Sequence, residues 1–383
     1  MIPSVLVYGA RDETFWSGTP YYFASALREF GEHAAQPFEV ENVGPKRTRE
    51  VIGTFTKWAL ANRTTRNRLF LLSPEYHDCS YPSGQCIPPA ATAMVSFSQV
   101  MPSAILAHKR AHPEFKLIQY IDATLHDLTA SFDWAQSPPP GVLQSLLDAE
   151  REAYSLVDRV CAFHDGVADS LVRHYGMDRS KISIEGRGVN LSPDQIDSAS
   201  SSTSPRAGTA ALRMCVVGKD PKRKGVYALI EAIDELSEKE QSQVELTLIG
   251  PDVSEIPKRP YIKALGFLQA SERPRLAGIM RGCNLGVLLS QAEGHPGSVW
   301  EFLTLGVPVW VSALPHVKDE IEGFPAMFEP LPLKHDALVA QLQSLLADPA
   351  QLDRLKAGST RSVQDLGWGR PAASVGRYLA ETV

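Results

Sequence analysis

Short apolar runs alternate with segments of helical periodicity along the first half of the chain. The runs cover residues 4–9, 68–73, 116–122, 159–164 and 181–186. Continuous runs of this kind suit strands that are buried on both faces, as in a parallel sheet. Residues 21–31 and 146–158 carry apolar side chains at helical spacing. The alternation predicts a layered α/β domain.

The alternation stops at residues 191–212, which are rich in Ser, Ala, Pro and Gly, and we interpret this stretch as an interdomain linker. It then resumes, with a predicted helix at 225–239 and strands at 213–218, 244–250, 284–290 and 307–312. The pattern therefore predicts a second α/β half. We find no detectable repeat between the two halves.

The composition of the chain excludes several classes of protein. The chain has 383 residues, enough for two domains of ordinary size. Its net charge of -6 gives no general attraction to nucleic acid, so no nucleic-acid partner is expected. The 5 cysteines have no zinc-type spacing, which favours reduced thiols in a cytoplasmic protein. Residues 1–13 lack the basic leader of a signal peptide, and no uncharged stretch is long enough to span a membrane.

Open α/β sheets bind ligands beyond the carboxyl ends of their strands, so the cleft between two such domains is the default site. After the first predicted strand, Gly9 and Gly18 permit close approach of backbone to a ligand. Ser17 or Thr19 could cap the next helix, whose N-terminus suits an anion. The segment lacks the GxGxxG fingerprint of nicotinamide sites. An ordinary capped helix explains it equally well.

A basic loop follows the strand predicted at 213–218. Lys219, Lys222, Arg223 and Lys224 lie between this apolar run and the next predicted helix. A charge run is usually a solvated face, but both flanks here are apolar and anchor the cations at a strand end. Phosphate recognition is the natural use of such a cluster, because Lys acts as a point charge and Arg as a fork.

Two carboxylates bracket a glycine turn in the segment EGHPGSVWE, residues 293–301. Gly297 and Ser298 open a predicted helix and could turn N–H groups toward a diphosphate. Glu301, one turn into that helix, suits hydroxyl groups such as those of a ribose, and Glu293 could do the same for a sugar ring. Alternatively, Glu301 only favours the helix dipole, which is worth roughly 0.3–1 kcal/mol.

Taken together, these motifs resemble a GT-B fold glycosyltransferase of the retaining family 4 type. Glu293 and Glu301 match the E-x7-E signature of that family, and LGVPVWVS follows as expected. VGKDPKRKG resembles its donor-phosphate loop, with Lys224 matching the family's lysine. Lys219 stands where the family more often has Arg. The resemblance spans nearly the whole chain, although residues 38–110 match poorly.

The resemblance implies two Rossmann-like α/β domains with parallel sheets that face each other across a cleft. Residues 1–190 would form the acceptor domain and residues 213–365 the donor domain, with the linker 191–212 between them. The final segment, residues 366–383, looks like the helix that crosses back onto the first domain in this fold.

The resemblance also implies roles for individual residues. A nucleoside diphosphate sugar (UDP- or GDP-linked) would be bound through Gly18, Lys219, Arg223, Lys224, Glu293, Gly294, His295, Gly297, Ser298 and Glu301. Within that set, Glu301 would contact the ribose and Glu293 the donor sugar, while Lys219 and Lys224 would neutralise the diphosphate. We count Glu293 and Lys224 as catalytic, with a front-face retaining mechanism in which Glu293 is not a nucleophile. Neither a metal nor a cofactor is expected.

On the acceptor side, Asp122 and His126 follow the strand predicted at 116–122. Related enzymes often place a His here to contact the donor, so both are catalytic candidates, although a lone His after a strand is more often structural. The acceptor could be a glycan, a lipid-linked sugar or a small molecule.

Residues 46–68 carry seven cations interleaved with Phe55 and Trp58. They form either a docking face, for anionic lipid at the inner side of the cell membrane or for a diphospho-lipid acceptor, or a solvated helix face. Two other functions stay open for the whole chain. One is a nucleotide-sugar epimerase or hydrolase on the same fold, and the other is a non-catalytic sugar-nucleotide-binding protein.

Overall fold

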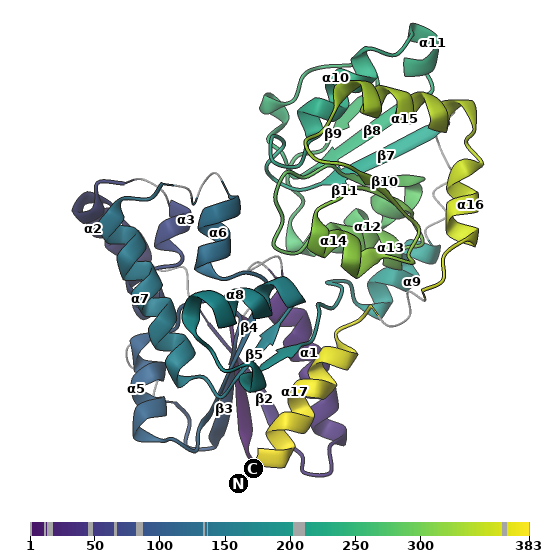
Figure 1. Cartoon of the computed structure of the whole chain (residues 1–383). Coiled ribbons are helices and arrows are strands. Elements are labelled where there is room, and N and C mark those ends of the chain that lie inside the picture. Colours follow the sequence, from purple (N-terminus) through teal and green to yellow (C-terminus); the bar gives the residue numbers. More distant parts are fainter. Residues whose placement is uncertain are drawn as a thin grey trace. The chain divides into compact units, whose positions relative to one another are not determined.

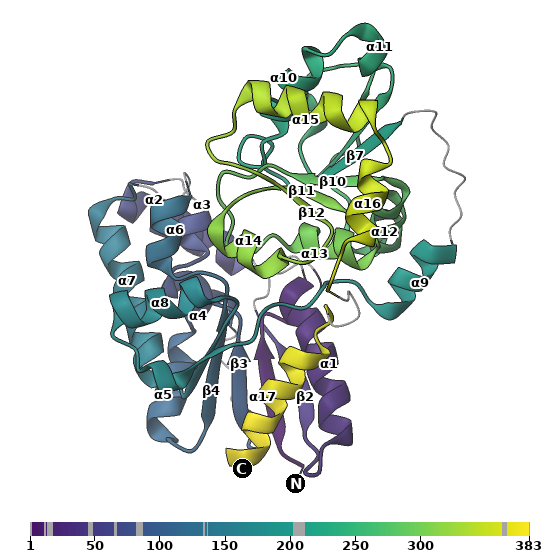
Figure 2. The same ribbon diagram turned by 45° about the vertical axis from the view of Figure 1, so that its right-hand side comes forward.

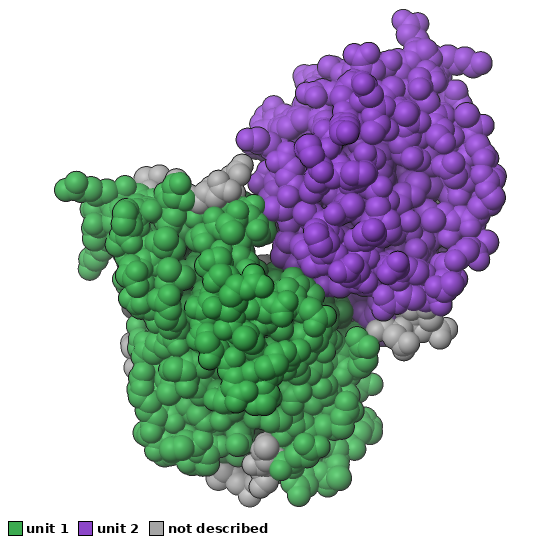
Figure 3. Space-filling view, viewed as in Figure 1, with its two compact units in different colours: residues 1–188, 367–383 green, residues 189–366 purple. Residues whose placement is uncertain are grey.

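The structure is a computed structural model that describes residues 2–10, 13, 18–44, 49–64, 67–81, 87–132, 135, 137–201, 211–361 and 366–382. The chain divides into two compact units (Figure 3). Unit 1 comprises residues 1–188 and 367–383, and unit 2 comprises residues 189–366. In the described part of the chain, no helix combines the length and the apolar character that a membrane crossing requires.

The described residues of unit 1 form a parallel six-stranded sheet in the order β2-β1-β3-β4-β5-β6. The strands are β1 (Ser4–Tyr8), β2 (Glu39–Val43), β3 (Ala91–Ser96), β4 (Lys116–Ile121), β5 (Arg159–Ala162) and β6 (Ile182–Ile184). One predicted strand, residues 68–73, is wrong. It contains helix α3 (Asn67–Phe70) and a turn, and Leu69 and Phe70 are buried beside Trp58. A short apolar run does not distinguish a buried strand from a buried helical turn.

Helices cover both faces of the unit 1 sheet, which separates two apolar clusters. Besides α3, the described α-helices of unit 1 are α1 (Thr19–His33), α2 (Arg49–Asn62), α4 (Pro74–Ser80), α5 (Ser103–Ala111), α6 (Leu125–Ser131), α7 (Pro140–Leu156), α8 (Asp165–Tyr175) and α17 (Gly369–Thr382). α17, at the C-terminal end of the chain, lies beside α1 in both ribbon views (Figures 1 and 2). Trp368 precedes α17, and its indole ring packs edge-on against Phe23 at 5.7 Å between ring centroids. The C-terminal segment is thereby anchored in the unit 1 core.

The described residues of unit 2 form a second parallel six-stranded sheet in the order β12-β11-β10-β7-β8-β9. Its strands are β7 (Leu212–Val217), β8 (Val244–Ile249), β9 (Ile262–Ala264), β10 (Leu285–Leu288), β11 (Val309–Ser312) and β12 (Ala326–Glu329). The α/β architecture with two parallel sheets, predicted from the sequence, is confirmed.

The helices of unit 2 include one that was not expected. They are α9 (Pro193–Ser201), α10 (Val226–Asp234), α11 (Glu238–Gln241), α12 (Arg273–Gly282), α13 (Gly297–Thr304), α14 (Pro315–Ile321), α15 (His335–Ala347) and α16 (Gln351–Ala357). α9 falls inside the stretch interpreted as a linker, residues 191–212. It packs on α12, and Ile196 joins the apolar cluster there. The start of that stretch therefore belongs to unit 2, and residues 202–210 lie outside the described part.

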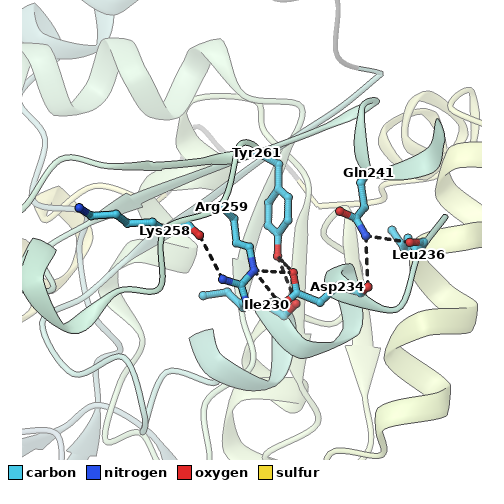
Figure 4. Close-up of polar contacts among 7 residues, drawn as sticks. All are labelled: Ile230, Asp234, Leu236, Gln241, Lys258, Arg259 and Tyr261. Atoms are coloured by element: carbon cyan, nitrogen blue, oxygen red, sulfur yellow. Dashed lines mark hydrogen bonds and ion pairs between the residues drawn. The ribbon is translucent and has the colours of Figure 1, made fainter. Parts of the chain in front are cut away.

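A polar network fixes the C-terminal end of α10 (Figure 4). The Asp234 carboxylate accepts hydrogen bonds from the Arg259 guanidinium and, at 2.6 Å, from the Tyr261 hydroxyl. The Gln241 amide donates to the carbonyl oxygens of Asp234 and Leu236. Partial burial and the bond to Asp234 raise the pKa of Tyr261. This network links the segment before β9 to the C-terminal end of α10. The N-terminal end of α10 directly follows the loop that carries the basic cluster.

Candidate functional site

The loops after β7 and β10 meet because these two strands are neighbours in the unit 2 sheet. Gly225 ends the first loop with φ of 69°, a left-handed conformation that favours glycine. A Cβ atom at this position would lie 2.2 Å from the carbonyl oxygen of Leu289 in the second loop. The Gln291 amide also donates to the Arg223 carbonyl at 3.0 Å. The missing side chain thus allows the loops to contact one another.

This contact brings Glu293 against two cations from the basic loop. Lys224 Nζ lies 2.6 Å and Arg223 Nη1 2.7 Å from the same oxygen, Glu293 Oε1. Arg223 Nη1 also donates to the Ala292 carbonyl at 2.7 Å. The side chains of Lys224 and Glu293 are only 9% and 7% exposed. Arg223, Lys224 and Glu293 therefore form a buried ion-pair group, which the sequence analysis did not anticipate.

Burial and charge oppose each other at Glu293. Burial alone would raise the pKa of its carboxyl, but attraction to Lys224 and Arg223 outweighs burial and lowers the pKa. At Lys224, burial lowers the pKa of the ammonium against the attraction of Glu293, and repulsion from Arg223 acts in the same direction as burial. Asp220 adds a second carboxylate, 3.9 Å from Arg223 Nε, so the two cations of the group face two carboxylates.

Lys219 takes no part in the described ion pairs of this group. It is exposed, and its ammonium lies over the Phe267 ring, 4.1 Å from the ring centroid. Phe267 is itself 53% exposed. The sequence did not single out Phe267, because a lone aromatic residue in a loop carries no signal of its own.

Glu301 lies on α13, which follows the glycine turn. The residue is buried, with 7% exposure, and its Oε1 lies 3.4 Å from Arg273 Nη1. The same nitrogen donates to the Asn190 carbonyl at 2.8 Å. Arg273 was not predicted as part of the site, since it is distant in sequence and lies in a segment without a motif.

The glycine turn itself is held by buried aromatic and charged side chains. The His295 ring is parallel to the Trp300 indole with centroids 5.8 Å apart, and His295 Nδ1 lies 3.1 Å from Glu320 Oε2. Gly294 is half-buried beside it. On α14, burial lowers the pKa of His316, which is hydrogen-bonded to the backbone of Glu293. Glu320 and His316 are further residues that sequence reasoning missed.

The first two residues of α13, Gly297 and Ser298, are half-buried at its N-terminus. The Gly297 N–H donates to the His295 carbonyl at 3.0 Å, so in this structure it closes the turn. The diphosphate contact expected of Gly297 from the sequence stays a prediction.

In unit 1, Gly18 begins α1 with φ of 86°, again the left-handed region. No side chain caps that helix at Gly18, and Thr19 Oγ1 instead accepts a hydrogen bond from Arg187 at 2.9 Å. Ser17, the other candidate cap, lies outside the described residues.

Asp122 is half-buried directly after β4, and His126 is exposed in the first turn of α6. Thr124 caps α6 in a capping box with Asp127. The His126 ring stacks on His174 with centroids 3.5 Å apart, and partial burial and His174 lower its pKa. The capping box explains Thr124 and Asp127 structurally. Nothing in these contacts assigns His126 a ligand.

A buried carboxylate that the sequence did not indicate supports the start of α6. Glu150 Oε1 accepts from the Leu125 amide at 2.9 Å and from the Tyr154 hydroxyl at 2.8 Å. Its other oxygen accepts from Tyr175. Burial raises the pKa of Glu150 to about 7 despite these bonds.

Two other expectations from sequence can be compared with the described residues. In the basic segment 46–68, residues 46–48, 65 and 66 lie outside them, while Lys57, Arg63 and Arg68 are exposed. No group of three His, Cys, Asp or Glu side chains suited to a metal ion occurs within the described residues.

Residues 205–361 match the family model of glycosyl transferases group 1. The match covers both loops of the site, so a glycosyl transferases group 1 domain makes up most of unit 2. This agrees with the glycosyltransferase resemblance of the sequence.

Two curated relatives are D-inositol 3-phosphate glycosyltransferases. The protein from Streptomyces bingchenggensis is 25% identical over 257 residues, which cover 61% of this chain and 55% of the relative. The protein from Rhodococcus opacus is 24% identical over 270 residues, which cover 65% and 59%. The chain thus spans less than two thirds of the length of these relatives.

Solved structures are similar over almost the whole chain. Sucrose-phosphate synthase from Thermosynechococcus elongatus has a TM-score of 0.66 at 16% identity, covering 100% of this chain and 99% of its own. The lipopolysaccharide glycosyltransferase WaaG has a TM-score of 0.61 at 14% identity, covering 98% and 99%. Anabaena HepE with UDP-glucose has a TM-score of 0.61 at 12% identity, covering 99% and 100%. These likenesses show the fold, which is GT-B.

Proposed function

We propose that the protein is a retaining, metal-independent glycosyltransferase. It moves a hexosyl unit from a nucleoside diphosphate sugar to a glycan, a lipid-linked sugar or a small molecule. The observation that carries the proposal is the buried group in which Lys224 and Arg223 converge on one oxygen of Glu293. It lies within the glycosyl transferases group 1 domain, after two neighbouring parallel strands.

The proposed chemistry follows from the two fixed cations, Lys224 and Arg223. When the bond between the sugar and the diphosphate breaks, negative charge develops on the leaving diphosphate. Lys224 and Arg223 are held in a site with little water, where they stabilise that charge without rearrangement. Chain cations thus do what a metal ion does in other transferases. Because Glu293 is tied to two cations, it is a weak nucleophile, so the retention that we propose would proceed by front-face attack of the acceptor and not through a covalent glycosyl-enzyme.

The other candidates take supporting roles in this proposal. Glu301 accepts hydrogen bonds from the ribose, Lys219 supplies a further charge toward the diphosphate, and Gly294, His295 and Ser298 border the sugar. For Gly297 to contribute its N–H, the bond to His295 must open. Gly18, Asp122 and His126 lie in unit 1, and we assign them to the donor sugar and the reacting acceptor.

The donor and the acceptor can be ordered for testing by the proteins that resemble this chain. HepE was crystallised with UDP-glucose, so UDP-hexoses are the first donors to examine and GDP-hexoses the next. The curated relatives are named for D-inositol 3-phosphate, which makes phosphorylated polyols reasonable first acceptors.

We also propose that α2 contacts an anionic membrane surface. One face of this helix packs inward through Trp58, yet Ile52 and Leu60 on its outer face are 69% and 76% exposed. Lys57 and Arg63 are exposed on or next to it. An apolar stripe with flanking cations fits such a surface. Binding to phosphatidylglycerol vesicles, absent with phosphatidylcholine and lost in Ile52→Asp/Leu60→Asp, tests this. Equal binding to both lipids or no binding would contradict it.

The decisive experiment for the donor site is calorimetry with UDP and GDP on Lys224→Ala. This variant loses a hydrogen bond to a charged group, so its affinity for the nucleotide should fall by about tenfold or more. Lys222→Ala is the matched control, since it removes an exposed lysine from the same loop and should change affinity by less than about threefold. Equal affinity of Lys224→Ala and the wild type would reject the site.

Product analysis separates the alternative functions. Mass spectrometry of a donor incubated with and without acceptors should show a new glycoside only when an acceptor is present. Free hexose or an epimerised donor without acceptor would favour a hydrolase or an epimerase. Tight nucleotide binding without turnover of any donor would favour a non-catalytic binding protein.

A further inference from the structure

Arg273 is in a place that local helix chemistry does not explain. It is the first residue of α12, where the helix dipole favours negative charge and opposes a cation. It is also only 9% exposed, although arginine is rarely buried without a partner. A buried cation at a helix position that disfavours positive charge indicates that a partner elsewhere in the fold requires it.

The contacts of Arg273 identify that requirement. The acid beside it, Glu272, is engaged locally, because its carboxylate accepts from the Gln269 amide at 3.0 Å and pairs with Arg275 at 2.6 Å. Arg273 instead reaches Glu301 on the neighbouring helix α13 at 3.4 Å, and it donates to the Asn190 carbonyl at 2.8 Å. One guanidinium therefore links two helices and the segment before α9.

Glu301 needs such a partner. A carboxylate that is 7% exposed stays ionised only if a cation or several donors compensate for the lost water. The ionised form is the one that can accept hydrogen bonds from two neighbouring hydroxyl groups, whereas a protonated carboxyl must donate at one oxygen. The guanidinium contacts one oxygen of the carboxylate, Glu301 Oε1, and so restricts the direction in which the carboxylate points.

We propose that Arg273 is a positioning residue for nucleotide recognition, which holds the Glu301 carboxylate charged and oriented toward the ribose hydroxyls. The inference rests on the proposed function, because it takes the ribose contact of Glu301 from there. It adds a residue outside the motifs on which that function was built. Arg273 acts through Glu301 and touches neither the diphosphate nor the sugar.

A double-mutant cycle tests this proposal. UDP and GDP affinities are measured by calorimetry for wild type, Arg273→Met, Glu301→Gln and the double variant. Arg273→Met should lower the affinity for the nucleotide by about tenfold, and Glu301→Gln should lower it by a similar factor. The double variant should be no more than about twofold weaker than Glu301→Gln, because Arg273 has nothing left to position. Arg275→Met, which removes an exposed arginine of the same helix, should bind as the wild type does.

A second readout separates positioning from general damage to the fold. The wild type should prefer UDP over 2′-deoxy-UDP (or GDP over its deoxy form) by about tenfold, the worth of one charged hydrogen bond. Arg273→Met should lose that preference while its affinity for the deoxynucleotide stays within about twofold of wild type. Arg273→Lys, which keeps the charge without the fork, should restore part of the preference.

The same four proteins can be compared by thermal unfolding without any ligand. Arg273→Met should lower Tm in the wild-type background and much less when Glu301 is already Gln, since no buried charge is then left unpaired. Additive losses of affinity, or an unchanged preference for the ribonucleotide in Arg273→Met, would overturn the inference. If the wild type binds neither UDP nor GDP, the ribose role fails together with the proposed function. In contrast, wild-type binding with an additive cycle refutes only the role of Arg273.

Discussion

The buried carboxyl group of Glu150 should make the stability of unit 1 depend on pH. Its pKa lies near 7 in the folded protein, against a usual value of 4.5, mainly because burial disfavours the charged form. At acid pH the group is protonated in both the folded and the unfolded chain and contributes no difference. Between 4.5 and about 7 the unfolded chain gives up the proton while the folded protein keeps it, so stability falls as pH rises.

The size of the effect follows from the two pKa values. They differ by about 2.5, which corresponds to a loss of about 3 kcal/mol that is complete just above pH 7. Glu150→Gln keeps the shape of the side chain and cannot ionise, so the stability of this variant should not fall in this way as the pH rises. Relative to wild type, the variant should gain up to about 3 kcal/mol between about pH 5 and pH 8.

Urea unfolding followed by circular dichroism across this pH range measures the difference. Glu152→Gln is the matched control, because Glu152 is an exposed acid on the same helix that pairs with Arg110. That control should follow the wild type at every pH. A free-energy difference between wild type and Glu150→Gln that is flat with pH, or that grows in favour of wild type, would refute the reasoning.

Three further predictions concern the scaffold. Gly225→Ala should cost about 1–3 kcal/mol, because it strains a left-handed backbone and meets Leu289; thermal unfolding measures this, with the open position Gly53→Ala as control. Trp368→Ala should cost about 3–5 kcal/mol in urea unfolding, since the indole is 4% exposed in the unit 1 core. A loss below about 1 kcal/mol would show that α17 does not depend on this anchor. Lys109→Met should cost about 3–5 kcal/mol by leaving Asp158 without its buried cation, and a neutral result in the same assay would count against that pairing.

Much of the fold could be predicted from apolar runs because parallel strands are buried on both faces. The runs at 4–9, 116–122 and 159–164 fall on β1, β4 and β5, and the runs predicted in unit 2 fall on β7, β8, β10 and β11. The failures are at weaker signals. β2 is an edge strand with the sequence EVENV, whose polar positions hide it, and β9 and β12 are edge strands of three and four residues. β3, with the sequence ATAMVS, was also missed although it lies inside the sheet, because small and polar residues interrupt its apolar run. The run at 68–73 is too short for its period to exclude a helical turn.

The candidate site could be predicted only where chemistry and strand ends coincide in the sequence. Lys224 and Glu293 each follow an apolar run, and neighbouring parallel strands bring such positions together. Arg273 and Glu320 belong to helices without a motif. Their partners are therefore set by how the helices pack in the fold, and the spacing of residues along the sequence does not indicate them. Glu150 is hidden for the same reason. Its neighbours in sequence are ordinary helix-forming residues, while its hydrogen-bond donors come from α6, α7 and α8.

Two of the residues that the sequence missed share a property that bears on how the proposed reaction would work. Arg273 and Glu320 each pair with a residue that the motifs had already marked, Glu301 and His295. The marked residues are buried, and a buried polar group is costly unless its partner is in place before the ligand arrives. A transferase that stabilises a leaving diphosphate through fixed charges needs those charges held in advance. In the proposed reaction, the motif residues would meet the donor, and their unmarked partners would hold them oriented before it binds.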